Sequence, residues 1–271
     1  MYTVSVSRPI PMVTLITDFG GRDGYVGIMK AVMLKLCKHI QTIDISHEIP
    51  PYDIRSAAFV LGQSYNYFPL DTLHVIVIDP KVGSDRRILY VEAGDYRFLA
   101  PENAVLQYVY DREDVHRTIE VKNHDYFLPE LSGTFHGRDI FAPVAAHLAN
   151  GLDPGELGGR LPTFDKILPP KPVFDGNTLR GEIVYIDHYG NMVSNISESM
   201  VADLKSGRMN FRILIAEREI RELSNSFYLD QSGDLLAYID SSSFLAFAIY
   251  GQNSAEKLGL SIGDRVEVDM R

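Results

Sequence analysis

The sequence predicts an α/β fold class with two domains: an N-terminal α/β domain with a mostly parallel central sheet, and a C-terminal all-β, barrel-like domain. Three observations lead to this prediction. Strand-like apolar runs alternate with helix-like runs in the first half, prolines cluster at 169–172, and short alternating segments between turn residues fill the remainder. We therefore assign residues 1–167 to the first domain, 168–177 to a linker and 178–271 to the second domain.

The first half begins with an apolar, β-branched run at 12–17, which is typical of a strand buried on both faces. A glycine-rich loop follows at 18–24, and apolar residues at helical spacing predict a helix over 25–38. Strands and helices then continue to alternate with short connections, as in β-α-β units. The further elements expected in this domain are helices at 53–65, 103–111 and 139–149, and strands at 41–45, 73–78, 87–93 and 96–100. The last two strands form a hairpin that turns at Gly94 and Asp95.

Beyond the prolines, short strands separated by turn residues indicate a small barrel. The expected strands are 179–186, 192–196, 209–215, 235–239, 244–249 and 265–268, with short helices at 197–204 and 255–258.

The net charge of the chain excludes some classes of binding partner. The 271 residues include 36 acidic and 26 basic side chains, a net charge of −10. This acidity argues against nucleic acid and against an anionic membrane surface as partners, because both bind to basic surfaces. The first 12 residues lack the features of a signal peptide, and no apolar run approaches the ~20 residues that span a bilayer. We expect a cytoplasmic protein whose single cysteine, Cys37, is a buried and inert thiol.

Polar side chains follow the first three strands, where ligands bind in open α/β sheets. Asp18 and Asp23 surround a glycine turn, a second cluster occupies 44–48, and a third occupies 79–86. A carboxylate directly after a buried strand, as at Asp18, can bind the two hydroxyls of a ribose. A helix cap or an Asx turn is the structural alternative. The loop matches neither the dinucleotide fingerprint nor the phosphate loop.

Asp79, Arg86 and His136 form the candidate catalytic set. Asp79 and Arg86 flank a glycine turn and can form a carboxylate–guanidinium pair, which could also be purely structural. His136 lies on a loop between two glycines, where a ligand can reach it. Together the three side chains can hold a water molecule and orient its lone pair.

A metal site is the competing interpretation. Its candidate ligands are Asp18, Asp23, His47, Asp79 and His136. No spacing typical of metal ligands occurs among them, so we expect none. Nucleophilic serine catalysis is disfavoured because no G-x-S-x-G segment is present.

In the second domain, residues 186–195 are dense in polar groups between two strands. A hairpin turn that uses Gly190 and Asn191 for positive φ is one interpretation. The functional alternative has the Asn191 amide hydrogen-bonded to an adenine edge and Tyr189 stacked on the base. Residues 240–243 form a second polar patch, which alone would be a surface loop.

Five segments, in this order and at these separations, resemble the S-adenosyl-L-methionine hydroxide adenosyltransferases. This family of adenosine-forming SAM hydrolases is related to the bacterial fluorinase and chlorinase. The segments are 17–20, 44–47, 79–83, 133–139 and 187–191. The resemblance extends over nearly the whole chain.

The resemblance implies an N-terminal α/β domain, a C-terminal β-barrel and a homotrimer with inter-subunit active sites. Asp79, Arg86 and His136 match the family's water-activating set. No cofactor is implied, since S-adenosylmethionine is the substrate. The matching substrate contacts are Asp18 for the ribose diol, Tyr52 for an aromatic neighbour, Asn191 for adenine, Asp187 for the methionine amino group, and Asp23 and Ser241 for further methionine contacts.

Four positions bear on which nucleophile is used and how methionine is held. The halogenating relatives carry a tyrosine at Asp79 and a hydroxyl residue at Gly137, so this chain resembles the water-using members. Lys81 stands where the hydrolases often have glycine, and Ser242 where relatives have an arginine.

The resulting hypothesis is hydrolysis of S-adenosylmethionine at C5′ to adenosine and L-methionine. A sulfonium leaves as a neutral thioether, so the reaction needs a positioned water more than an acid. The alternatives are a sensor that binds adenosine or S-adenosylmethionine without turnover, and a metal-dependent hydrolase.

Overall fold

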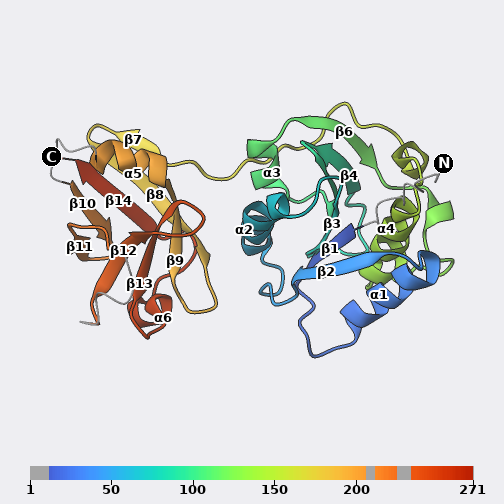
Figure 1. Cartoon of the computed structure of the whole chain (residues 1–271), viewed down its shortest axis with the longest axis horizontal. Helices are drawn as coiled ribbons and strands as arrows, with labels where there is room; N and C mark the ends of the chain where they lie inside the picture. The colour runs from blue at the N-terminus through green and yellow to red at the C-terminus, as the bar shows by residue number, and fades with distance from the viewer. Residues whose placement is uncertain (1–11, 206–210, 225–232, 271) are drawn as a thin grey trace, which may run out of the picture. The chain divides into compact units, whose positions relative to one another are not determined.

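The computed structural model describes residues 12–205, 211–224 and 233–270, and the chain divides into two compact units between Leu168 and Pro169 (Figure 1). The first unit contains a mixed sheet with helices, and the second contains a nearly closed antiparallel sheet. The predicted fold class is therefore confirmed.

The described part of the N-terminal unit has a six-stranded sheet in the order β2-β1-β3-β5-β4-β6. Strand β1 pairs in parallel with β2 and β3, and β3 pairs in parallel with β5. Strand β4 is antiparallel to both β5 and β6, so the parallel half of the sheet holds β1 and β3. The strands are β1 (Met12–Thr17), β2 (Gln41–Ser46), β3 (Leu73–Val77), β4 (Ile88–Ala93), β5 (Tyr96–Pro101) and β6 (Val115–Glu120).

Helices cover both faces of this sheet (Figure 1). Helices α1 (Tyr25–Leu36) and α4 (Ala142–Ala149) share one apolar cluster, and α2 (Ile54–Ser64) and α3 (Gln107–Arg112) share the other. In β1, Val13 and Leu15 belong to the first cluster and Ile16 to the second, so this strand is buried on both faces as predicted. Because β2 and β3 lie on opposite sides of β1, the connections diverge at the carboxyl ends of β1 and β3, where ligands bind in such sheets.

The described part of the C-terminal unit is an antiparallel sheet in the order β11-β10-β14-β8-β9-β13-β12, with β7 paired to β8. The end strands β11 and β12 contact each other, so the sheet curls around one apolar cluster. Met209, the expected start of one strand, lies outside the described residues, and the strand begins at Phe211. The elements are β7 (Val173–Asp175), β8 (Thr178–Ile186), β9 (Met192–Ser197), α5 (Glu198–Lys205), β10 (Phe211–Ile215), β11 (Arg218–Ile220), β12 (Leu235–Ile239), β13 (Phe244–Ile249), α6 (Ser254–Leu258) and β14 (Arg265–Met270).

Cys37 is buried beside α1, as expected. Within the described ranges, the structure has no helix that is both long and apolar enough to cross a membrane.

His74 is a fully buried histidine in β3, remote from any expected chemistry. Its Nδ1 lies 2.7 Å from Thr14 Oγ1, and its ring stacks on Phe98 at 5.2 Å between centroids. Burial lowers the pKa of His74 to about 3. The folded protein therefore holds this ring neutral at pH values where the unfolded chain binds a proton.

We expect His74 to make the folded state less stable as the pH falls from about 6.5 toward 3, because only the unfolded state gains the proton over that range. Between pH 7 and pH 5 this group alone should remove roughly 2 kcal/mol from the free energy of unfolding. The measurement is urea unfolding at both pH values for the wild type and for His74→Gln, which cannot titrate. The same change at the exposed His116 is the matched control. An unchanged pH slope in His74→Gln would contradict the expectation.

Candidate active site

A pocket of about 260 Å³ lies in the N-terminal unit beyond the carboxyl ends of β1 and β3. Asp18 follows β1 directly, Asp79 lies two residues after β3, and His136 lies on the loop that leads into α4. Parallel strands end at the same edge of a sheet, which is why these distant sequence segments converge. The pocket is lined by Asp18, Phe19, Tyr25, Pro51, Tyr52, Val77, Asp79, Val82, Thr134, Phe135, His136 and Gly137.

Asp79 and Arg86 form a buried ion pair at this pocket. Arg86 Nη2 donates to Asp79 Oδ2, and the two side chains are only 8% and 5% exposed. At this burial an unpaired charge would be costly, so each group balances the charge of the other. Arg86 Nε is buried and has no hydrogen-bond partner among the described residues, which leaves it free to bind a further molecule.

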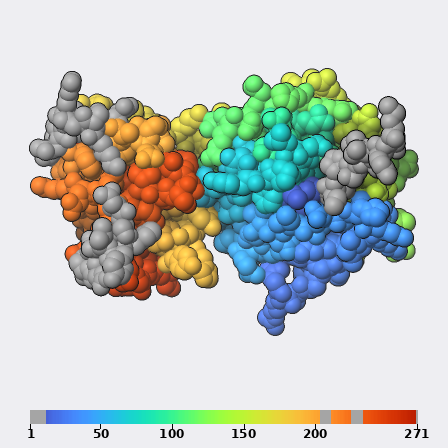
Figure 2. All heavy atoms as spheres, in the orientation of Figure 1, coloured from blue at the N-terminus to red at the C-terminus, as the bar shows by residue number. Residues whose placement is uncertain are grey.

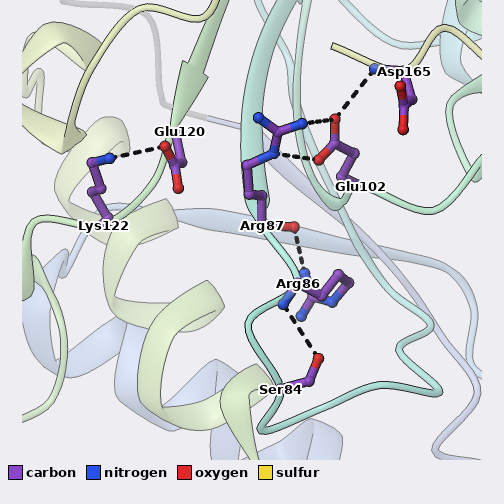
Figure 3. Close-up of polar contacts among 7 residues, drawn as sticks. All are labelled: Ser84, Arg86, Arg87, Glu102, Glu120, Lys122 and Asp165. Atoms are coloured by element: carbon purple, nitrogen blue, oxygen red, sulfur yellow. Dashed lines mark hydrogen bonds and ion pairs between the residues drawn. The ribbon is translucent and has the colours of Figure 1, made fainter.

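The backbone next to Arg86 is fixed by a second ion pair, between Arg87 and Glu102 (Figure 3). The Arg87 guanidinium donates two bonds to the Glu102 carboxylate, at 2.5 and 2.8 Å. Arg86 Nη1 donates to the carbonyl oxygen of Arg87 at 2.6 Å, and Arg86 N donates to Ser84 Oγ at 3.2 Å. These contacts hold the Arg86 guanidinium against Asp79.

Glycine lets the loop that carries Asp79 lie against the loop that carries His136. Gly83 has φ +82°, and a Cβ on it would lie 2.4 Å from the carbonyl oxygen of Gly133. Gly137 is also confined, because a Cβ there would lie 3.1 Å from Met29 Sδ. The two loops can therefore approach this closely only because Gly83 and Gly137 have no side chains.

Replacing Gly83 by Ala should lower catalytic activity by at least about tenfold, because the clash with Gly133 displaces Asp79 from His136. Gly151→Ala is the matched control, because Gly151 has φ +92° but nothing within 4 Å of the added Cβ. Turnover and thermal unfolding are measured for both variants. Equal activity in the two variants would show that the contact between the loops does not matter.

His136 lies directly before a π-helical turn, Gly137–Phe141, that continues into α4. Burial lowers the pKa of His136, assisted by the Arg86 charge and opposed by Asp79 and Asp139. The ring is therefore neutral near pH 7. Its Nδ1 is buried and, among the residues described, has no partner, so it can accept or donate a hydrogen bond to a bound molecule.

The helix expected at 139–149 starts two residues earlier, at Gly137, so Asp139 lies inside its first turn. Asp139 is fully buried. Its carboxylate accepts from Ser132 N at 2.7 Å and pairs with Arg138 Nε at 2.6 Å, so it fixes the loop in front of His136.

Asp18 neither caps α1 nor forms a local turn with its side chain, since Gly24 is the N-cap and the carboxylate reaches another loop. Its Oδ2 accepts from Tyr52 N at 2.9 Å. Burial raises the pKa of Asp18; the bond from Tyr52 N opposes this rise, and the Asp79 charge adds to it. Tyr52 has φ +67°, a strained conformation that places its 68% exposed side chain at the pocket.

Three aromatic rings that the sequence had not assigned to the pocket also line it. Tyr25 and Phe135 meet edge-to-face at 5.0 Å between centroids, and Phe19 packs against both. Phe19 and Phe135 stand inside the segments that suggested the family, next to the polar residues, which was the available signal. Tyr25 gave none, because it also begins a helix.

Of the five candidate metal ligands, Asp18, Asp79 and His136 line the pocket, and Asp23 and His47 do not. His47 Nδ1 lies 2.8 Å from Thr17 Oγ1, and Asp23 is exposed and does not line the pocket. Within the described ranges, no group of three or more His, Cys, Asp or Glu side chains is arranged to hold a metal ion.

Three more predicted residues, Asp187, Tyr189 and Asn191, lie in the C-terminal unit at the β8–β9 turn. Asp187 accepts from Tyr189 N, from Asn191 N and from Asn191 Nδ2, at 2.9, 2.8 and 2.8 Å. Gly190 has φ +82°, and a Cβ on it would lie 2.0 Å from Asn253 Oδ1. The segment is therefore a hairpin turn as predicted, but only Gly190 has the expected positive φ and Asn191 does not. The turn also fixes the plane of the Asn191 amide.

This turn borders a pocket of about 550 Å³ in the C-terminal unit, so Tyr189 and Asn191 lie where a ligand can enter. Asn253, the N-cap of α6, gave no sequence signal for this place. Ser241 is exposed on the β12–β13 turn and does not line the pocket. The lining residues are Tyr189, Asn191, Ile249, Tyr250, Gly251, Gln252 and Asn253.

Comparison with known proteins matches the two units to two separate family models. The family model described as SAM hydroxide adenosyltransferase N-terminal domain matches residues 13–158, and its C-terminal counterpart matches residues 181–267. The (R)-S-adenosyl-L-methionine hydrolase of Salinispora tropica is 34% identical, over 96% of this chain and 98% of that protein. The hydrolase of the same name from Methanocaldococcus jannaschii is 31% identical, over 96% of each chain.

More distant and structural relatives fit the same pattern. A fluorinase of an Actinoplanes species is 26% identical, over 95% of this chain and 97% of that protein. The crystal structure of an uncharacterized conserved protein from Thermotoga maritima superimposes with a TM-score of 0.87 at 33% identity, over 95% of this chain and 99% of that one.

Proposed function

The chain belongs to the SAM hydroxide adenosyltransferase family, and we propose that Asp79, Arg86 and His136 activate the water with which it cleaves its substrate. The protein is an S-adenosyl-L-methionine hydrolase that forms adenosine and L-methionine. The observation that supports the catalytic assignment is the buried Asp79–Arg86 pair beside His136, with Arg86 Nε and His136 Nδ1 unpartnered among the described residues.

In this mechanism a water oxygen attacks C5′ as the C5′–S bond breaks, and sulfur keeps the bonding electrons as a neutral thioether. Asp79 accepts a hydrogen bond from the water and directs its lone pair at C5′. Full deprotonation of the water beforehand would be costly, because free water has a pKa near 15.7. In this mechanism the water therefore loses its proton as it attacks. Alignment at about 3–3.5 Å can lower the barrier by several kcal/mol. The neutral His136 takes up the proton that is released.

The substrate's ribose and sulfonium are assigned to the same pocket. The Asp18 carboxylate, already oriented by Tyr52 N, accepts hydrogen bonds from the two ribose hydroxyls. The Tyr52 ring and the carboxylates of Asp18 and Asp79 favour the cationic sulfonium, with about 0.5–1 kcal/mol from an exposed cation–π contact. Asp23 stays a prediction for the methionine end.

We assign adenine to Asn191 and Tyr189, the methionine amino group to Asp187, and a further methionine contact to Ser241. Asn191 donates to Asp187 once from its backbone N and once from its side-chain Nδ2. The side-chain amide therefore keeps its oxygen and one N–H for the adenine edge. We further propose a homotrimer in which the N-terminal unit of one subunit and the C-terminal unit of the next complete each site.

Mixed trimers test this assembly. Asp79→Asn and Asn191→Ala subunits, each defective alone, are coexpressed at equal levels, and activity is measured below the wild-type KM. In a random trimer with shared sites, about one quarter of the sites combine two intact halves. About a quarter of wild-type activity is expected. No recovery in trimers shown to be mixed would place each site within one subunit.

The reaction itself is tested in water enriched in ¹⁸O. Adenosine carrying the label on its 5′ oxygen and unlabelled L-methionine are expected on chromatography with mass detection. Methylthioadenosine or S-adenosylhomocysteine as product would overturn the assignment, and tight binding without product would favour a sensor. Because the curated relatives' names specify the (R) form, we propose that this chain acts on that sulfonium epimer, which separated epimers would decide.

We propose that no metal or cofactor takes part, because the sulfonium leaves without activation. Activity should survive prolonged dialysis against EDTA, and loss that added divalent metal restores would support the metal-dependent alternative. Cytoplasmic location is part of the same proposal and is checked by fractionating cells that express the natural chain.

A further inference from the structure

The polar cluster at 44–48, which the catalytic assignment does not use, lies against the start of the active-site pocket. His47 follows β2 and faces Thr17, the last residue of β1. Thr17 is fully buried, and the next residue is Asp18. The His47 side chain is 13% exposed, so it lies beneath the surface rather than in the pocket.

The contacts of His47 link Asp44 to the end of β1. Its Nε2 lies 3.0 Å from Asp44 Oδ1, at ion-pair distance, but among the described residues this atom makes no hydrogen bond. On the other side of the ring, Nδ1 and the Thr17 hydroxyl share a hydrogen bond of 2.8 Å. The Thr17 oxygen in turn accepts from Phe19 N at 3.3 Å.

Lys30 of α1 contacts Asp44 on its other oxygen, with its Nζ 2.5 Å from Asp44 Oδ2. The Asp44 carboxylate is thus bound on one oxygen by Lys30 and approached on the other by His47. Burial raises the pKa of Asp44, but the bond from Lys30 and the nearby His47 outweigh this effect and lower the pKa below its usual value. A fixed anion therefore sets the orientation of the imidazole.

The same two loops are joined by the backbone. Gly20 N donates to the carbonyl oxygen of His47 at 2.8 Å, and Tyr52 N donates to Asp18 Oδ2 at 2.9 Å. The loop after β1 otherwise projects from the unit (Figure 2), with Gly20 at φ +67° and exposed residues from 21 to 25. Three contacts thus attach the base of a projecting loop to the segment that carries Tyr52.

We propose that His47 is a positioning residue for substrate binding, acting through Thr17 to hold Asp18 and Tyr52 in their places at the pocket. This inference rests on the proposed role of Asp18 toward the ribose diol. His47 touches neither substrate nor water in this proposal, so its loss weakens binding of the ribose and leaves the Asp79–Arg86–His136 set in place.

Substitution of His47 by Ala should raise KM for S-adenosylmethionine about tenfold or more and change kcat by less than about threefold, since a buried hydroxyl loses its partner. An Asn side chain reaches the Nδ1 position but not Nε2, and Gln reaches Nε2 but not Nδ1. His47→Asn should therefore recover most of the affinity and His47→Gln should not. His39→Gln, an exposed position, is the control.

Two readouts separate positioning from general destabilisation. Thr17→Val and His47→Ala should be non-additive in KM, because each breaks the same contact. The preference for adenosine over 2′-deoxyadenosine in equilibrium binding should shrink in His47→Ala, since the diol contact is what is lost. Additive effects, an unchanged preference, or equal KM for His47→Asn and His47→Gln would overturn the proposal.

Asp18→Asn distinguishes failure of this inference from failure of the function it rests on. If Asp18→Asn leaves KM unchanged, the ribose role of Asp18 is wrong. If Asp18→Asn raises KM and His47→Ala does not, the ribose role stands and the positioning role of His47 falls.

Discussion

Replacing Asp79 by Asn should lower kcat by about 10²–10⁴-fold with a much smaller change in KM. The amide keeps the shape of the carboxylate but loses the charge that draws a water hydrogen and balances the buried Arg86 guanidinium. The measurement is initial-rate release of adenosine from S-adenosylmethionine, with substrate binding followed separately by calorimetry. Unchanged kcat in folded protein would reject the assigned role.

The variant also leaves Arg86 without its anionic partner, which typically destabilises a protein by about 3–5 kcal/mol. Thermal unfolding is therefore recorded beside turnover, and Arg86→Lys provides a second variant that retains both charges but not the guanidinium geometry. Asp85→Asn, at an exposed position on the same loop, is the control and should keep wild-type kcat.

Most of the fold could be predicted because its elements are marked by local pattern. The run at 12–17 became β1 with the expected bounds, and Asp53, read as the start of a helix, is the N-cap of α2 and accepts from Ser56 N. Strand β6 was missed because Val115–Glu120 mixes charged and apolar residues at the sheet edge. Strands β7 and β11 were missed because three residues are too few to show alternation.

The polar residues of the site could be predicted from the sequence, but three of the aromatic residues that line the pocket were not. Asp18 and Asp79 follow buried strands, so sheet geometry alone brings them together. The early start of the helix after His136 was not readable, since Gly137 reads as a helix breaker until Met29 is seen to exclude a side chain there. The contribution of His47 was equally hidden, because its partner Thr17 is 30 residues away and looks like an ordinary strand residue.

Replacing His136 by Ala should lower kcat by about 10²–10³-fold and remove the acid limb from the pH profile of kcat/KM. Turnover requires the neutral ring, so wild-type kcat/KM should fall as acid protonates His136 in the free enzyme. Because burial and the Arg86 charge lower the pKa of this ring, the fall should occur below the ordinary histidine value near 6.5. The measurement is kcat/KM from pH 4.5 to 8.5, with His39→Gln as the exposed control.

A change at Asp139 tests whether the acid limb of the pH profile comes from His136. Asp139 raises the pKa of His136, so Asp139→Asn should move the acid limb to still lower pH in whatever activity remains. Loss of activity through a displaced loop would instead lower kcat/KM at every pH without moving the limb, since Asp139 also holds Ser132 N. A limb that survives in His136→Ala must belong to another group, and His136 would then not be the proton acceptor.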